Sequence, residues 1–329
     1  MSDTTTNLDH LQAAGKKELA EALSNLEINW ESRQVRTFLD GAHGRFWGRS
    51  QDSSQGRSPD DRVIGITGPP GVGKSTLIGK LIRLYRQQGL SVGVVAVDPS
   101  SQISGGSLLG DRTRMNPDPD DPGIFIRSLA ARDRLGGLSE FAFPTITLMC
   151  ALFDLVIVES VGVGQSESDV AGVVDTLVLC VQPGSGDSLQ FMKAGLTEIP
   201  DIAVVTKADI EGNAEQSFYD LKNALVASGT NGWETRVHLI STQLETGLDD
   251  LLGSLDEHAA WLNEAGRRVV QRQSQSRQWL ENSLREQFGR VGLKHAQAFL
   301  TAENLSTPFV TERNISTRFH KIYLDVSDA

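Results

Sequence analysis

A glycine-rich segment carries the residue types that bind phosphate groups. Gly68-Pro69-Pro70-Gly71-Val72-Gly73-Lys74-Ser75-Thr76 matches the pattern G-x-x-x-x-G-K-[ST] in full. Glycines let backbone N–H groups converge on phosphate oxygens, while Lys74 can reach the β- and γ-phosphates and the Ser75 hydroxyl can ligate Mg²⁺. The alternative, an ordinary glycine-rich turn, is disfavoured because the whole motif stands between an apolar run at 63–67 and a helical pattern at 77–82. The segment therefore predicts a nucleoside triphosphate site.

Two aspartates lie where a carboxylate could hold the Mg²⁺ of such a site. Asp98 ends the apolar run 91–97, and an acid at this position can bind Mg²⁺, although an Asp-Pro turn explains it equally well. Asp111 follows a pair of glycines at 105–106, as in a loop that orders on a γ-phosphate, and could organise Mg²⁺ or the attacking water. The alternative for Asp111 is a solvated surface loop.

A third acid, Glu159, follows four apolar residues at 155–158. An unpaired buried carboxylate is costly, which favours a role in polarising water near Mg²⁺ over a charge at a solvated strand end. Three residues later, the N–H of Gly162 can donate to the γ-phosphate. The candidate metal ligands are therefore Ser75, Asp98, Asp111 and Glu159, and the candidate catalytic residues are Lys74 with the three acids.

The base recognised by the site is indicated by Thr206-Lys207-Ala208-Asp209. An aspartate can accept hydrogen bonds from N1–H and the 2-amino group of guanine, whereas adenine would leave the carboxylate unpaired. The Lys207 side chain would lie along the base and ribose. A surface loop is the alternative for an isolated Lys-x-Asp, but a strand-terminal serine two elements later favours guanine. The predicted binding set is completed by Ser241, Thr242 and Gln243.

The elements that position these residues alternate between strands and helices. Apolar runs without polar alternation, typical of strands buried on both faces of a parallel sheet, occur at 63–67, 91–97, 124–127, 154–159, 176–181, 202–206 and 236–240. Segments with helical length and spacing occur at 75–88, 139–153, 187–198 and 214–228. This order predicts an α/β fold with a doubly wound, mainly parallel sheet and ligands beyond the carboxyl ends of its strands.

Helical extensions are expected on both sides of the sheet domain. Two helices are predicted within 8–48, and the polar stretch 49–61 is interpreted as a linker. Further helices are predicted at 247–264 and 266–290, the second with an apolar stripe that could pack on its own domain or face a partner. The expected domains are an N-terminal extension (1–60), a nucleotide-binding domain (61–246) and a C-terminal helical region for dimerisation (247–329).

Composition limits the classes of function. The chain has 329 residues, 39% hydrophobic and 22% charged, as in soluble globular proteins. Its formal net charge of −11 argues against a protein that coats nucleic acid. No apolar run reaches the roughly 20 residues of a membrane-spanning helix, and no signal peptide is evident. Cys150 and Cys180 are interpreted as buried residues in a reducing cytosol, and no metal-binding cluster of Cys or His is evident.

Together these motifs resemble the MeaB/ArgK family of P-loop GTPases, which includes the human methylmalonic aciduria type A protein. The stretches that carry the resemblance are ITGPPGVGKST, VAVDPSSQISGGSLLGDRTRM, VIVESVGVGQSESDV, QPGSGDSLQFMKAG and VVTKAD. They extend over roughly residues 12–290. The resemblance implies a SIMIBI-class fold and a GTP- and Mg²⁺-dependent, cytoplasmic homodimer. It also implies switch segments at 104–115, 161–168 and 184–193, with Asp187, Gln190 and Lys193 communicating with a partner.

The function implied by the resemblance is that of a GTPase chaperone for adenosylcobalamin-dependent acyl-CoA mutases, chiefly methylmalonyl-CoA mutase. GTP binding and slow, partner-stimulated hydrolysis would gate cofactor loading and the removal of inactivated cofactor. A cobalamin adenosyltransferase is a further candidate partner. Three alternatives remain open: a kinase for a periplasmic amino-acid-binding protein, a nickel-delivery GTPase for hydrogenase or urease maturation, and a scaffold that only binds nucleotide.

The sequence departs from the family pattern in three places. The usual Asn of Asn-Lys-x-Asp is Thr206, so the contact to guanine N7 and the neighbouring backbone is expected to be weakened or replaced. Losing one neutral hydrogen bond should cost up to about tenfold in GTP affinity. The usual Ser-Ala is Ser241-Thr242, and the tail beyond about residue 300 does not resemble the family.

Overall fold

The chain forms two compact units. The computed structural model describes residues 7–51, 62–99, 115, 118–131, 140–160, 166–184, 200–210, 213–226 and 232–327. One unit, here called the sheet unit, comprises residues 58–142 and 153–267. The other, here called the helical unit, comprises residues 1–57, 143–152 and 268–329. Each unit is described separately below.

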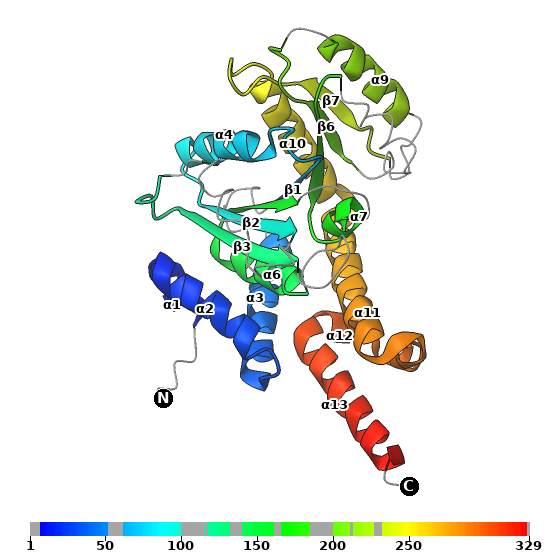
Figure 1. Cartoon of the computed structure of the whole chain (residues 1–329). Coiled ribbons are helices and arrows are strands. Elements are labelled where there is room, and N and C mark those ends of the chain that lie inside the picture. Colours follow the sequence, from blue (N-terminus) through cyan, green and yellow to red (C-terminus); the bar gives the residue numbers. More distant parts are fainter. Residues whose placement is uncertain are drawn as a thin grey trace. The chain divides into compact units, whose positions relative to one another are not determined.

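The sheet unit is built on seven parallel strands in the order β3-β2-β4-β1-β5-β6-β7 (Figure 1). Their bounds are β1 (Arg62–Thr67), β2 (Val92–Pro99), β3 (Ile124–Ala131), β4 (Leu155–Ser160), β5 (Thr176–Val181), β6 (Ile202–Val205) and β7 (Arg236–Leu239). All seven strands were expected from their apolar runs, so the prediction of a doubly wound parallel sheet is confirmed. In this order, the strand that leads into the glycine-rich segment lies at the centre.

Helices cover both faces of this sheet. They are α4 (Lys74–Gln87), α7 (Ser166–Ala171), α9 (Ala214–Val226) and α10 (Leu248–Asn263). Alternate residues of β1 point to opposite faces: Ile64 and Ile66 join the core cluster with α4 and α10, while Gly65 lies against Val170 of α7. The faces are therefore distinct layers, and both are apolar because the inner strands β1, β4, β5 and β6 are buried along their whole length.

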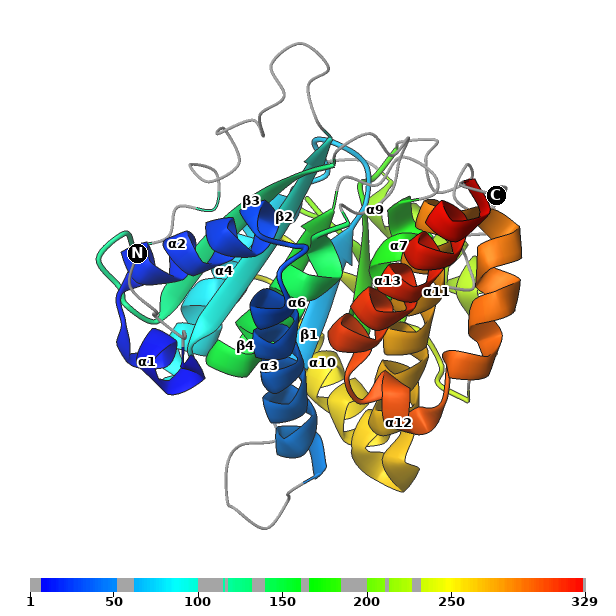
Figure 2. The same ribbon diagram turned by 90° about the horizontal axis from the view of Figure 1, so that it is seen from below.

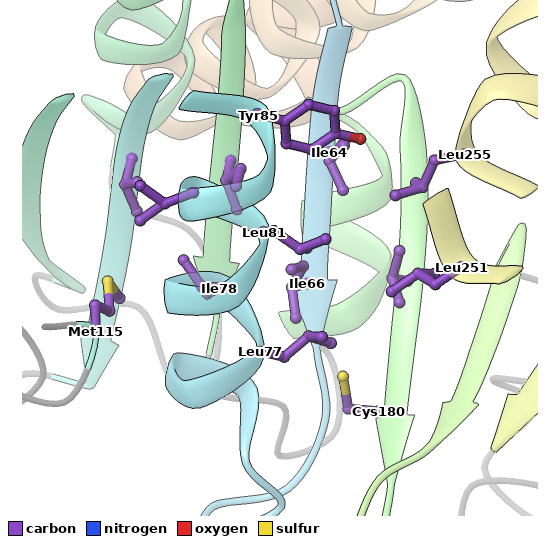
Figure 3. Packing of buried hydrophobic residues seen from close by; sticks show 14 of the residues in the cluster. Ile64, Ile66, Leu77, Ile78, Leu81, Tyr85, Met115, Cys180, Leu251 and Leu255 are labelled. Carbon is purple, nitrogen blue, oxygen red and sulfur yellow. The ribbon is translucent and has the colours of Figure 1, made fainter. Parts of the chain in front are cut away.

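The core under α4 fixes the helix that follows the glycine-rich segment. Figure 3 shows Leu77, Ile78, Leu81 and Tyr85 directed from one side of α4 towards the strands, each at most 2% exposed. The spacing of these residues by one, three or four places forms the apolar stripe of an amphipathic helix. Burial of each such side chain contributes about 1.5–3 kcal/mol, so the start of α4 is firmly positioned relative to β1.

Three aspartates join neighbouring strands at the amino edge of the sheet, and each stands immediately before a strand. Asp154, before β4, accepts from the backbone N–H of Ser91 at 2.9 Å. Asp175, before β5, accepts from the N–H of Val63 at 3.0 Å, and Asp201, before β6, accepts from that of Leu177 at 2.8 Å. These carboxylates satisfy backbone donors at strand starts, where the ladder of hydrogen bonds has not yet begun.

The helical unit combines segments from both ends of the chain. Its helices are α1 (Leu8–Ala13), α2 (Lys16–Ile28), α3 (Arg33–Gln51), α6 (Ala142–Leu152), α11 (Arg267–Ala296), α12 (Ala302–Leu305) and α13 (Pro308–Ser327). Figure 2 shows α13 alongside α11, and residues of both helices, including Leu280, Leu284 and Phe319, form one apolar cluster. Trp279 of α11 also packs on Phe143 and Phe309, with ring centroids 5.5 Å and 4.8 Å away.

Polar groups are buried inside the helical unit, and their partners hold α3 against α13. Arg36 and Glu312, each 1% exposed, form an ion pair at 2.6 Å. Asp40 accepts from the backbone N–H groups of Phe309 and Val310 at the start of α13. His43 lies 3.2 Å from the Ser306 carbonyl and 3.0 Å from Ser276 Oγ. Such buried groups persist only when they are paired, so they specify how these helices pack.

Some helix bounds differ from the sequence prediction. Three helices rather than two occupy the N-terminal segment, because Ala14 and Gly15 are extended and separate α1 from α2. The predicted helix at 187–198 lies outside the described residues. The tail beyond residue 300, for which no individual helices were predicted, forms α12 and α13. Among the residues described, no helix is both long and apolar enough to cross a membrane.

Candidate nucleotide-binding site

The glycine-rich segment lies between β1 and α4 as a phosphate-binding loop requires. Gly68, Gly71 and Gly73 have φ angles of 143°, 78° and 106°, a range that residues other than glycine rarely adopt. A Cβ atom on Gly68 would also lie 2.2 Å from the carbonyl oxygen of Cys180 at the end of β5. Two of the glycines of the motif are thus needed for conformation alone, and Gly68 is needed for both conformation and space.

Carbonyl groups of this loop accept hydrogen bonds from side chains. Lys74 Nζ donates to Gly68 O at 2.7 Å and to Pro69 O at 3.0 Å. The hydroxyl of Thr206 donates to Val72 O at 2.6 Å, and Lys207 Nζ donates to Gly71 O at 2.7 Å. A carbonyl oxygen directed at a triphosphate would repel it. Because these carbonyl oxygens are hydrogen-bonded to side chains, the backbone N–H groups of the loop are favoured at the position of the phosphates.

The environment of Cys180 fits an interior position beneath the loop. Its side chain is fully buried, and burial raises the pKa of the thiol to about 12, although nearby Lys74 opposes the shift. Cys150 is buried as well, so the predicted burial of both cysteines is confirmed. A thiol with so high a pKa is neutral and unreactive near pH 7.

Two of the predicted Mg²⁺ ligands meet at the carboxyl edge of the sheet. Ser75 Oγ donates to Glu159 Oε1 at 2.9 Å, and Glu159 at the end of β4 is 6% exposed. The next residue, Ser160, donates from its hydroxyl to Thr67 Oγ1 at 3.1 Å. A hydroxyl and a buried carboxylate in contact are oxygen donors of the kind that Mg²⁺ prefers. These residues therefore fit the metal.

The base-recognition segment is attached to the phosphate-binding loop by consecutive residues. Thr206 is 2% exposed, and its hydroxyl also lies 3.0 Å from Val181 O. Lys207 has a left-handed backbone with φ 54°, and its ammonium bonds Gln182 Oε1 at 3.0 Å in addition to Gly71 O. Thr206, which replaces the usual asparagine, thus makes a neighbouring-backbone contact through its hydroxyl.

The loop after β7 lies next to this segment. The backbone N–H of Ala208 donates to Ile240 O at 3.1 Å, which joins the two loops. Ser241 is 1% exposed and its Oγ accepts from the N–H of Leu244 at 3.0 Å, while Thr242 is half-buried and Gln243 exposed. Asp209 is exposed beside them. The carboxylate expected to read guanine is therefore accessible at the same edge as the loop.

Several predicted site residues lie outside the part of the chain that the structure describes. Asp98 lies at the end of β2, paired in register with Ala130, but its side chain is outside the described residues. The following candidates lie wholly outside them: Asp111, Gly162, Asp187, Gln190 and Lys193. Of the expected site, the structure brings together the phosphate-binding loop, Glu159, the base-recognition segment and the loop after β7.

Two features near the site were not predicted from the sequence. Gln182, directly after β5, contacts Lys207, and no pattern in the sequence signals this contact. Gly79 of α4 approaches Met115 so closely that a Cβ would lie 2.5 Å from the Met115 carbonyl oxygen. A lone glycine inside a helical pattern is the signal for such an approach.

The central parallel sheet, the glycine-rich loop before α4 and the Ser75–Glu159 contact define a P-loop nucleotide-binding protein. A family model for the methylmalonyl-CoA mutase-associated GTPase MeaB matches residues 52–295. The chain therefore belongs to the MeaB family of GTPases, which confirms the resemblance seen in the motifs.

Individual relatives agree with this assignment. The GTPase ArgK of Escherichia coli is 38% identical over 82% of this chain and 84% of its own length. A relative from Pyrococcus abyssi is 46% identical over 62% of this chain, which spans 64% of that protein. The mitochondrial methylmalonic aciduria type A homolog of mouse is 35% identical over 72% of this chain and 59% of its own length.

A solved structure supports the fold over almost the whole chain. The crystal structure of an LAO/AO transport system kinase aligns with a TM-score of 0.62 and 25% sequence identity. The alignment covers 97% of this chain and 99% of that one.

Proposed function

We propose that this protein binds and hydrolyses GTP in order to gate the loading and protection of adenosylcobalamin on an acyl-CoA mutase, chiefly methylmalonyl-CoA mutase. The match of the family model over residues 52–295 carries the proposal, because that family is described by its association with this mutase. The similarity to the mouse methylmalonic aciduria type A homolog supports it. The protein would act in the cytoplasm as a homodimer through residues 247–329, with a cobalamin adenosyltransferase as a second partner.

Binding of the triphosphate would use the groups already positioned around the loop. Backbone N–H groups of residues 68–76 would donate to phosphate oxygens, and Lys74 would exchange its two carbonyl partners for the β- and γ-phosphates. Asp209 would accept from guanine, with Thr206, Lys207 and the loop at 241–243 beside the base. The triphosphate and the guanine base of GTP would thus be held by segments that are hydrogen-bonded to each other.

Ser75 and Glu159 would hold Mg²⁺, with Asp98 and Asp111 as further ligands. The ion would neutralise charge that develops on the phosphate oxygens during hydrolysis. Glu159 would orient or polarise water, and the N–H of Gly162 would donate to the γ-phosphate. Hydrolysis by the protein alone would be slow, because no arginine stands in the phosphate-binding loop.

The length of chain before Met115 is compatible with a role for Asp111. Met115 is 2% exposed and packs beside Gly79 of α4. Four residues can span about 13 Å, whereas Gly79 lies about 6 Å along the helix from Ser75. Asp111 would therefore be able to reach the metal. Asp187, Gln190 and Lys193 would communicate with the mutase.

Phosphate release tests the proposal. Release from GTP should be slow for the purified protein and should rise at least severalfold when adenosylcobalamin-dependent methylmalonyl-CoA mutase is added. Lys74→Ala should abolish nucleotide binding in calorimetry, since it removes the ammonium that faces the phosphates. Lys222→Ala, an exposed change on α9, is the matched control.

Two results would contradict the proposal. Undiminished GTP affinity in Lys74→Ala would remove the binding mechanism. A mutase that neither forms a complex nor accelerates hydrolysis would favour a scaffold that only binds nucleotide.

A kinase acting on a periplasmic amino-acid-binding protein is a second candidate, since the aligned crystal structure carries the name of a transport system kinase. It would transfer the γ-phosphate to a protein. Radiolabel moving from GTP to any protein would favour this candidate over hydrolysis.

A further inference from the structure

We propose that Gln182 is a positioning residue for guanine nucleotides, which holds the Lys207 ammonium and thereby controls how long GTP and GDP stay bound. The inference rests on the proposed use of Lys207 at the base and names a further residue of that site. Gln182 is the first residue after β5. The predicted binding set includes neither Gln182 nor any residue of that strand.

The contacts around Lys207 form the second of two parallel connections. In the first, the hydroxyl of Thr206 lies against Val72 O of the phosphate-binding loop and Val181 O of β5. In the second, the residue adjacent to each of these is used: Lys207 Nζ bonds Gly71 O and Gln182 Oε1. Three segments that are distant in sequence are therefore joined at two successive positions. Only the second connection uses a side chain from β5 or its end.

The chemistry of the pair fixes the orientation of the amide. A lysine ammonium has donors and no acceptor, so Gln182 must present its oxygen to Lys207. A hydrogen bond to an ionised group is stronger than one between neutral groups. Gln182 therefore restrains a side chain that otherwise has four rotatable bonds and high conformational entropy.

Lys207 needs this restraint because its backbone is unfavourable. Its φ of 54° lies in the left-handed region, which is strained for a residue with a Cβ and is maintained only by surrounding contacts. Backbone bonds from Ala208 N to Ile240 O and from Ile210 N to Lys207 O supply part of the support. The ammonium contacts hold the other end of the residue. Loss of Gln182 should loosen both the lysine stem along the base and the Gly71 carbonyl.

The expected effect falls equally on both nucleotides. Because Lys207 lies at the base end and at the loop apex rather than at the γ-phosphate, Gln182→Ala should speed the release of labelled GTP and GDP by a similar factor. One charge-assisted hydrogen bond in a half-exposed position corresponds to about three- to tenfold. Gln182→Glu retains an oxygen acceptor and should restore slow release. Gln216→Ala, on the exposed face of α9, is the matched control.

Stopped-flow release of fluorescent GTP and GDP, with equilibrium titration, tests the proposal. A double-mutant cycle with Lys207→Met separates positioning from a structural role: in that background Gln182→Ala should have no further effect. Release from Gln182→Ala within twofold of the parent would overturn the inference. Fast release from Gln182→Glu would also overturn it. So would a finding that Gln182→Ala speeds release as much in the Lys207→Met background as in the parent. If the parent itself binds no guanine nucleotide, the proposed function fails instead, which is a distinguishable outcome.

Discussion

At the scale of single residues, the site is defined by which oxygens are already engaged. Carbonyl oxygens of the phosphate-binding loop bond Lys74, Thr206 and Lys207, and the Ser75 hydroxyl bonds Glu159. Asp209, by contrast, is exposed. The loop is thus supported by hydrogen bonds within the protein, while the carboxylate expected to identify the base faces solvent.

Base selectivity depends on that carboxylate. Asp209→Asn should lower the preference for GTP over ATP by at least tenfold, because an amide oxygen can accept but its NH₂ group opposes a donor on guanine. Competition binding against a fluorescent nucleotide measures the ratio. Asp220→Asn, exposed on α9, is the control, and an unchanged ratio for Asp209→Asn would contradict the assigned role.

Single residues also show how far prediction from the sequence could go. The conformation of Gly68 and the burial of Glu159 could be predicted, because the motif and the apolar run before the acid each carry a physical requirement. The contact of Lys207 with Gln182 could not, since it joins residues 25 positions apart through a side-chain rotamer. Nor could the hydroxyl of Thr206 be assigned to Val72, because a departure from the usual asparagine shows what is lost and not what replaces it.

At the scale of elements, the packing of α4 on the core determines where the phosphate-binding residues lie. Its apolar stripe packs on the sheet, and its first residues are Lys74 and Ser75. Strands and helices of this unit could be predicted, because parallel strands buried on both faces have continuous apolar runs. The helices of the tail could not, since α13 is held to α3 by polar groups such as Asp40 and Glu312 that leave no periodic signal.

The close approach of α4 to Met115 predicts the effect of a small substitution. Gly79→Ala should lower the free energy of unfolding by about 1 kcal/mol, although alanine favours a helix, because its Cβ would lie 2.5 Å from a backbone oxygen. Gly253→Ala in α10 has no atom within 4 Å of its new Cβ and should raise stability by about 0.5–1 kcal/mol. Urea unfolding measures both. Equal shifts in the two variants would contradict the predicted steric conflict.

At the scale of the whole molecule, the helical unit contains ionisable groups whose burial makes its stability depend on pH. Burial lowers the pKa of His43 to about 4, against the partly opposing effect of its hydrogen bond to Ser306. The neutral ring can donate from Nδ1 to Ser306 O and accept at Nε2 from the Ser276 hydroxyl. Burial raises the pKa of nearby Asp40 to about 6. The contribution of Asp40 to stability therefore depends on pH in the opposite direction, since it is lost as the pH rises.

The contribution of His43 can be isolated by substitution. Its pKa is lower in the folded than in the unfolded chain, so its stabilisation is complete above about pH 6.5 and is lost as the pH falls towards 4. The parent should lose on the order of 1–3 kcal/mol over this range relative to His43→Gln, in which Asp40 titrates as before. Chemical unfolding at several pH values measures the difference. A difference independent of pH would contradict the prediction.

The aspartates before β4, β5 and β6 have a consequence for the opposite end of the sheet. Asp154 and Asp201 each stand five residues before a residue of the nucleotide site, Glu159 and Thr206, a distance of about 17 Å along a strand. Sliding either strand by one residue would displace its far end by about 3.3 Å, more than the length of the hydrogen bonds these residues make. The aspartates at the amino edge of the sheet therefore fix the positions of Glu159 and Thr206 at its carboxyl edge.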